Sequence, residues 1–113
     1  MKIFVAMAAT KKLSNADGLD VSGPMKVELD IAATFRTDGS FDPNDKDSKA
    51  IRNDLKKNGL GLKVVEFRGP GGGWPTVEVF GTKANITNYL KEHYLKGEDK
   101  ETIQEFISSI VKV

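Results

Sequence analysis

The fold is decided by a stretch that reads MKVELDIAATF, from Met25 to Phe35. Apolar and polar residues alternate along it with the period of two that turns successive side chains of a β-strand to opposite faces. One face is entirely apolar and consists of Met25, Val27, Leu29, Ile31, Ala33 and Phe35. The other face is mainly polar, and Lys26, Glu28, Asp30, Thr34 and Arg36 lie on it. We therefore predict a strand over residues 25–35 with one face in the core and the other in water.

A strand is also predicted before this one. Both alternating sets of residues 3–9 are apolar, which is typical of an interior strand: Ile3, Val5, Met7 and Ala9 on one face, and Phe4, Ala6 and Ala8 on the other. Residues 11–24 contain Asp17-Gly18 and Gly23-Pro24, so we expect a loop there. The apolar run ends at Lys11 and Lys12, well short of the roughly 18 residues of a membrane span, and we expect no membrane association.

The next element is a surface helix. Asp42-Pro43 reads as an N-cap followed by proline at the first helical position, and Asn58-Gly59 supplies the turn residues that end a helix. Ile51 and Leu55 give it a narrow apolar stripe. Two short strands are then predicted at residues 62–68 and 76–81, joined by a glycine-rich connection at 69–75.

Two helices complete the chain. Thr82 or Asn85 caps the first of them, which has Ile86, Tyr89, Leu90, His93 and Tyr94 at helical spacing. After a break at Lys96-Gly97, Asp99 caps the last helix. The apolar face expected for that helix comprises Ile103, Phe106, Ile107, Ile110 and Val111.

The predicted order is thus β-β-α-β-β-α-α, in a single α+β domain over residues 1–113. Its simplest architecture is a two-layer sandwich, in which about three helices pack on a mainly antiparallel four-stranded sheet. The length of 113 residues and the apolar share of 39% suit one core. The formal net charge is +1, with no polybasic or acidic arm. The chain has no cysteine, which excludes disulfides, thiolate catalysis and Cys-ligated metals.

The glycine-rich connection, Gly-Pro-Gly-Gly-Gly-Trp-Pro over residues 69–75, is the most distinctive local feature. It matches neither a P-loop nor a dinucleotide fingerprint, since it leads into a strand and not into a helix. One interpretation is a bent hairpin whose glycines serve backbone geometry, with Trp74 over the core edge. The other is a recognition tip that binds a partner or an anion. The candidate binding residues are Arg68, Gly71, Gly72, Gly73, Trp74 and Pro75.

Other candidate sites have simpler structural explanations. His93 is the only histidine, so a His-rich metal site is excluded and a structural or surface role is expected. The cluster of Asp42, Asn44, Asp45 and Asp47 lacks the glycine and glutamate of an EF-hand, and helix capping explains it better. The sequence presents no coherent catalytic set, and we expect no enzymatic activity, cofactor or metal.

The unit from Val65 to Leu90 consists of a strand, the Gly-Pro-Gly-Gly-Gly-Trp-Pro connection, a second strand that ends in Phe80-Gly81-Thr82, and a helix. It resembles a hairpin pattern in small uncharacterised accessory proteins of tailed bacteriophages. The resemblance implies a phage-encoded viral protein that acts in the bacterial cytoplasm. It carries no functional residues over to this chain.

Three functional hypotheses follow. The first is a non-enzymatic binding protein that contacts a host or viral protein through the tip at 71–75. The second is sequestration of a small anionic metabolite or nucleotide by the glycine-loop N–H groups and Arg68. The third is weak nucleic-acid binding by the basic side of the first helix, which carries Lys46, Lys49, Arg52, Lys56 and Lys57. The water-facing side of the 25–35 strand leaves a homo-oligomer open.

Overall fold

A computed structural model describes residues 23–67 and 73–113 of the chain. Its strands are β1 (Met25–Asp30), β2 (Gly61–Glu66), β3 (Thr76–Gly81) and β4 (Val111–Lys112). Its helices are α2 (Lys46–Lys57), α3 (Lys83–Tyr89) and α4 (Lys100–Ser108), and the π-helix η2 (Leu90–Tyr94) continues directly from α3. The predicted strand at residues 3–9 lies outside the described residues.

The four strands form one antiparallel sheet with the order β2-β3-β1-β4. The two central strands pair along their full length, with Val27 opposite Val79 and Leu29 opposite Val77. On the other face of the same pair, Lys26 Nζ lies 2.9 Å from Glu78 Oε2. The alternation in β1 therefore divides an apolar face from a charged one, as the sequence predicts. The predicted α+β class with a four-stranded antiparallel sheet is confirmed.

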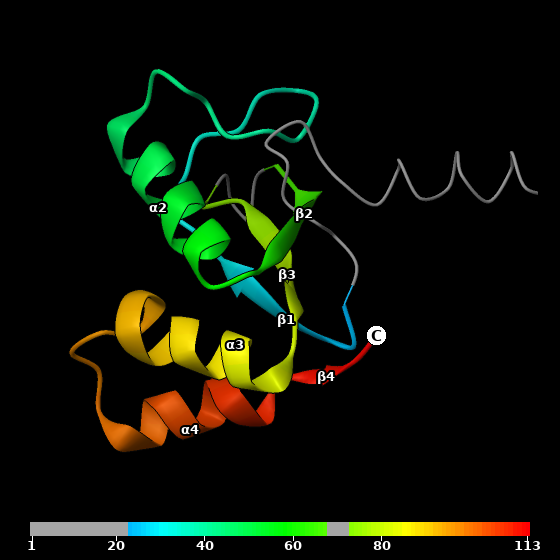
Figure 1. The fold of residues 1–113 in the computed structure, drawn as a ribbon. Coiled ribbons are helices and arrows are strands. Elements are labelled where there is room, and N and C mark those ends of the chain that lie inside the picture. Colours follow the sequence, from blue (N-terminus) through cyan, green and yellow to red (C-terminus); the bar gives the residue numbers. More distant parts are fainter. Residues whose placement is uncertain (1–22, 68–72) are drawn as a thin grey trace, which may run out of the picture.

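The helices form a second layer on the apolar face of the sheet (Figure 1). Leu55 of α2, Leu62 of β2 and Ile86 of α3 are fully buried in the core between the layers. Helix α4 has no buried residue and packs on η2, where the Tyr94 and Phe106 ring centroids are 5.6 Å apart. The core is thus built mainly by the sheet, α2 and α3, and α4 covers its edge.

The strand predicted over 25–35 is shorter than expected, because β1 ends at Asp30. Its partner β3 begins at Thr76, and the last hydrogen bond of this pair runs from Ile31 N–H to the Pro75 carbonyl (3.0 Å). Proline cannot donate to extend the ladder, so the chain leaves the sheet there. Beyond it, Phe35 forms an isolated bridge with Phe41, and the two ring centroids are 4.6 Å apart.

The start predicted for the first helix is also wrong. The cap of α2 is Asp45, whose side chain accepts from Ser48 N–H (3.2 Å), and not Asp42. Asp42 instead accepts from Asn44 N–H (2.9 Å) in a turn before the helix. Asp42 and Asp45 both suit an N-cap, but it is Asp45 that hydrogen bonds to Ser48. Ser48 also accepts from Thr34 N–H (2.7 Å), and this bond anchors the start of the helix to the loop after β1.

The remaining helix ends agree better with the sequence. Gly59 ends α2 with φ of +68°, Thr82 caps α3, and Asp99 caps α4 by accepting from Thr102 N–H. Hydrogen bonds from Thr102 lower the pKa of Asp99. The last helix stops at Ser108, however, so Val111 lies not on its apolar face but in β4, where it pairs with Lys26 of β1.

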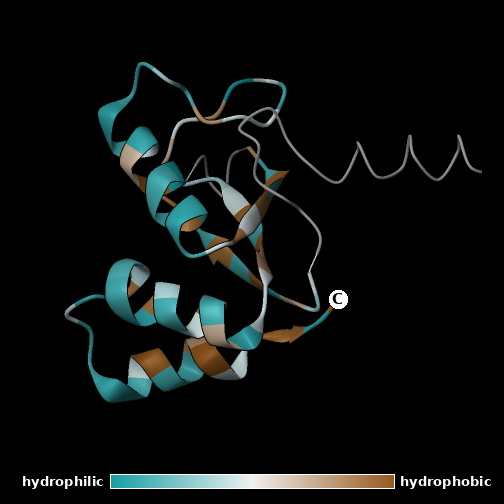
Figure 2. Cartoon of the chain, in the orientation of Figure 1, coloured by the Kyte–Doolittle hydropathy of each residue, from teal (hydrophilic) through white to brown (hydrophobic). Residues whose placement is uncertain are grey.

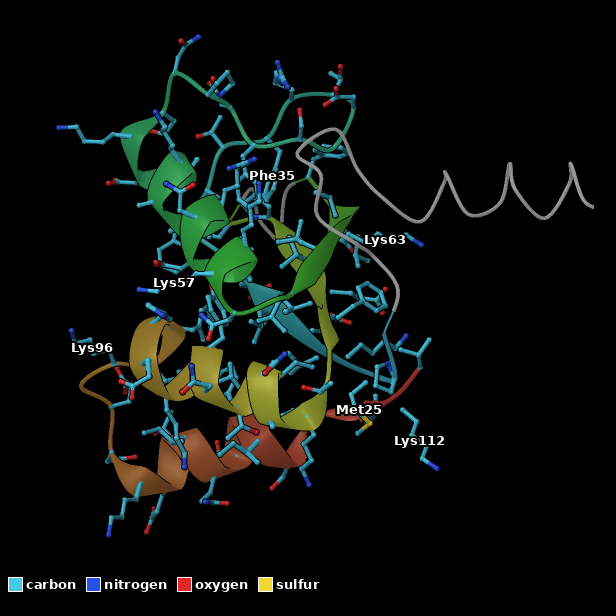
Figure 3. All side chains as sticks on the ribbon, viewed as in Figure 1. Met25, Phe35, Lys57, Lys63, Lys96 and Lys112 are labelled. Atoms are coloured by element: carbon cyan, nitrogen blue, oxygen red, sulfur yellow. The ribbon has the colours of Figure 1, made fainter. Side chains whose placement is uncertain are left out.

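The outer surface is charged on both sides of the sandwich. Helix α2 is mainly hydrophilic, whereas α4 carries hydrophobic and hydrophilic residues (Figure 2). Lys57 and Lys96 project from the helical side, and Lys63 and Lys112 project on the side of the sheet (Figure 3). In the described part of the chain, no helix has the length and apolarity needed to cross a membrane.

Candidate functional site

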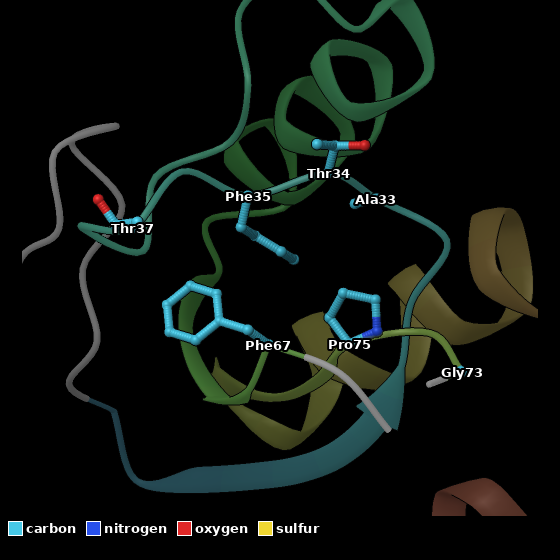
Figure 4. A pocket seen from close by; sticks show the side chains of 7 residues that line it. All are labelled: Ala33, Thr34, Phe35, Thr37, Phe67, Gly73 and Pro75. Carbon is cyan, nitrogen blue, oxygen red and sulfur yellow. The ribbon is translucent and has the colours of Figure 1, made fainter. Parts of the chain in front are cut away.

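Two cavities are lined in part by the short segment that follows β1. The larger, the Phe67 cavity, has a volume of about 810 Å³. Its lining residues are Ala33, Thr34, Phe35, Thr37, Phe67, Gly73 and Pro75. Phe35 comes from the segment after β1 and lies across the opening from Phe67 and Pro75 (Figure 4). None of these seven side chains is charged, so this cavity can offer apolar contact and two threonine hydroxyls.

The smaller cavity, which we call the Trp74 cavity, has more functional groups in its lining. It has a volume of about 270 Å³. It is lined by Ile31, Ala32, Ile51, Asp54, Trp74, Tyr89, His93 and Tyr94. Four of these side chains have aromatic rings and one is a carboxylate. Ligand sites typically combine an apolar lining with a few convergent polar groups, and the Trp74 cavity is therefore our candidate functional site.

Four separate segments position the lining of the Trp74 cavity. The segment after β1 supplies its floor at Ile31, which is only 2% exposed. Helix α2 supplies Ile51 and Asp54, which share one side because residues three apart are neighbours on a helix. Trp74 reaches the cavity from the end of the glycine-rich connection and is 61% exposed. The site therefore exists only when the sheet and the helices are packed together.

The fourth segment is the junction of α3 with η2. Tyr89 is the last residue of α3, and His93 and Tyr94 belong to the π-helix, which a Leu95 N–H to Leu90 carbonyl bond of 2.7 Å closes. The Tyr94 hydroxyl donates to the Asp30 carbonyl (2.6 Å), which holds this junction against the end of β1. π-Helices are rare in proteins, and those that do occur are often found at functional sites.

A histidine and an aspartate meet at the cavity wall. His93 Nδ1 lies 3.4 Å from Asp54 Oδ2, and their side chains are 29% and 39% exposed. The His93 ring also lies against Tyr89, with 5.8 Å between ring centroids. Nearby, Asn88 Nδ2 of α3 donates to Asn58 Oδ1 at the end of α2 (2.7 Å). These contacts fix the distance between the two helices that form the cavity.

The two tyrosines of the site are shielded from ionisation. Burial raises the pKa of Tyr89, and the negative charge of Asp54 raises it further. Burial also raises the pKa of Tyr94, and the charge of Asp30 adds to this effect. A phenol with its ordinary pKa of about 10 is already neutral near pH 7, and these shifts extend that neutrality to higher pH, so the cavity presents aromatic rings and hydroxyl groups and not anions.

The predicted site residues have different outcomes. Arg68, Gly71 and Gly72 lie outside the described residues, so the anion-binding hypothesis that depends on them stays a prediction. Gly73 is exposed and lines the Phe67 cavity, as does Pro75, whose carbonyl accepts from Ile31 N–H. Trp74 is exposed at the Trp74 cavity. The structure thus assigns Trp74 and Pro75 to different cavities.

Sequence reasoning missed the two polar residues that distinguish the Trp74 cavity. His93 was expected to be structural or on the surface, and Asp54 was not expected to face a site. The spacing of Tyr89 and His93 does place both on one side of a helix, and Asp54 follows Ile51 by three residues on the apolar stripe of α2. The contact between these two helix faces depends on the tertiary structure, and neither sequence pattern predicts it.

Two further observations concern the charged side chains of the described residues. Among residues 23–67 and 73–113, no group of three or more histidine and acidic side chains is placed to hold a metal ion. On α2, Lys46, Lys49, Lys56 and Lys57 are exposed beside the exposed Asp47, and Arg52 donates to Asn53 (3.2 Å). Nucleic-acid binding by this helix stays a prediction.

Comparison of the chain with models of protein families, with curated proteins and with solved structures finds no match.

Proposed function

We propose that this chain is a non-enzymatic binding protein that contacts another protein through Trp74 and the cavity beside it. The resemblance of residues 65–90 to phage accessory proteins extends the proposal to a phage-encoded factor that acts on a host or viral protein in the bacterial cytoplasm. The observation that carries it is a tryptophan, 61% exposed, in the lining of a cavity.

An exposed tryptophan next to a cavity suits protein recognition for two reasons. Tryptophan is enriched among the few residues that dominate interface energies, because it buries a large apolar surface at a small cost in side-chain entropy. The cavity of about 270 Å³ is slightly smaller than the roughly 300–1,000 Å³ usual for small-molecule pockets, and is of a size to accept a side chain.

The first prediction concerns capture of a partner. Tagged wild-type protein incubated with bacterial lysate should retain a partner, and Trp74→Ala should lose most of it, because the contact surface of the indole is removed. Loss of one interface anchor of this kind costs about 2 kcal/mol or more, which is a roughly thirtyfold weaker complex. Quantitative mass spectrometry of the retained proteins measures the change.

A matched control is Phe67→Ala, which removes another exposed aromatic side chain (49% exposed) that lines the other cavity. It should capture the partner as well as the wild type does. Circular dichroism melting of both variants checks that they fold. Equal capture by Trp74→Ala and the wild type, or capture lost equally in both variants, would contradict a Trp74 contact.

A further inference from the structure

The side chains that line the Trp74 cavity indicate which chemical group of a partner it can bind. Its one carboxylate, Asp54, stands among the rings of Trp74, Tyr89, His93 and Tyr94, and none of the eight described lining residues is lysine or arginine. The faces of aromatic rings are electrostatically negative and attract cations. The lining therefore favours a cationic ligand over an anionic one.

We infer that the Trp74 cavity receives an arginine side chain of the partner protein, with the guanidinium group stacked on the Trp74 indole and paired with the Asp54 carboxylate. This inference rests on the proposed function and specifies which group of the partner enters the cavity.

Arginine fits this lining better than lysine does. The guanidinium group is planar, so it can stack on an indole while its edge donates hydrogen bonds to a carboxylate. An ammonium group is more strongly hydrated and does not stack. Asp54 is 39% exposed, which leaves its carboxylate accessible from the opening, and its contact with His93 uses Oδ2. Trp74 is 61% exposed and belongs to the lining, so its indole has free surface for the guanidinium group.

The small volume argues for one side chain and against a free nucleotide or a larger cationic ligand. Aliphatic contact with Ala32 and Ile51 would accommodate the methylene stem of arginine, which packs well on apolar surface. Charge, shape and size thus agree on the same occupant.

The test uses the chain's single tryptophan as its own reporter. The full chain is titrated with the capped tripeptide Ac-Gly-Arg-Gly-NH₂ in one buffer for all peptides and variants, and Trp74 fluorescence is followed. Matched peptides replace arginine with citrulline, which keeps the shape without the charge, or with lysine. The arginine peptide should bind roughly tenfold more tightly than the citrulline peptide, with the lysine peptide between them.

Asp54→Asn keeps the size of the side chain and removes its charge, so the ratio between the arginine and citrulline affinities should fall from about tenfold to roughly twofold, the preference that the cation–π contact with Trp74 alone supports. The control is Glu92→Gln, which removes the same charge from an exposed position on η2 outside the lining and should keep the ratio. Circular dichroism melting confirms that both variants fold.

Several outcomes would overturn the inference: citrulline binding within about twofold of arginine, lysine binding more tightly than arginine, or an unchanged ratio in Asp54→Asn. Trp74 emission that depends on protein concentration without any peptide would identify a second copy of the chain as the occupant, and would also overturn it. Its failure is distinguishable from that of the proposed function, because capture that depends on Trp74 would persist if the partner used another side chain.

Discussion

At the scale of single residues, the pKa values of the two tyrosines of the Trp74 cavity reflect how deeply their side chains are buried. Tyr89 is 2% exposed, and Tyr94 is half-buried with its hydroxyl on the Asp30 carbonyl. Burial in each case favours the neutral phenol, and the neighbouring carboxylates of Asp54 and Asp30 act in the same direction. A raised phenol pKa is therefore a direct consequence of the packing that forms the site.

This raised pKa gives a second line of tests, since Tyr89 and Tyr94 are the only tyrosines in the chain. Their tyrosinate absorbance should appear at higher pH in the folded protein than in urea, where the pKa is about 10. The stability that comes from the raised pKa is complete below about pH 10 and is lost as the pH rises through the folded values, by up to about 1.4 kcal/mol per pH unit for each group.

Tyr89→Phe serves as the control for this titration, because it leaves Tyr94 as the sole chromophore and should reduce the loss of stability at high pH. If the folded protein and the urea-unfolded protein show the same tyrosinate titration, the tyrosines are not buried as described.

At the scale of elements, the start of α2 shows where local sequence rules stop. Asp42-Pro43 matches the sequence signature of a helix start, yet the helix begins three residues later, after Asp45. Asp45 is selected by Ser48, a fully buried residue that hydrogen bonds to Asp45 and to Thr34. The existence and end of this helix were predictable from Leu55 and Gly59, but its start depends on a contact with a distant loop.

The same contrast predicts a difference between two aspartates. Asp45→Ala should destabilise the protein by about 1 kcal/mol, within the usual range of roughly 0.5–2 kcal/mol for a lost N-cap, because Ser48 N–H loses its acceptor. Asp42→Ala removes a single turn hydrogen bond to Asn44 and should cost less. Urea denaturation measures the free energy of unfolding of both variants. A larger loss of stability for Asp42→Ala would indicate that Asp42 is the N-cap, as the sequence alone predicts.

The strands show how pairing decides boundaries. The alternation in residues 25–35 fixed which side chains face the core, and Val27, Leu29 and Ile31 are buried as predicted. It could not show that the ladder stops at Pro75, since that depends on the partner strand. Nor did it reveal β4, which pairs with β1 and contains Val111, a residue expected in the last helix because it continues the apolar spacing of α4.

At the scale of the whole molecule, the candidate site was predictable only in part. Trp74 stood out in the sequence because it is the single tryptophan in a glycine-rich connection. Its neighbours Asp54 and His93 come from two helices separated by the β2–β3 hairpin, and only the packing of both helices on the same face of the sheet brings them together. A recognition residue could be read from the sequence, whereas the cavity is a property of the assembled fold.

Because the Trp74 cavity combines the sheet, α2 and η2, its integrity should be lost together with the core. Fluorescence of Trp74 and far-ultraviolet circular dichroism should report one coincident unfolding transition in urea, as expected for a two-state protein of this size. Leu55→Ala, which removes a fully buried side chain next to Asp54, should shift both transitions by the same amount and destabilise the protein by about 2–5 kcal/mol.

If the fluorescence transition occurs at lower urea than the circular dichroism transition, Trp74 lies on a segment that detaches before the core unfolds. The cavity would then not be preformed, and an arginine ligand would have to order it at the expense of affinity.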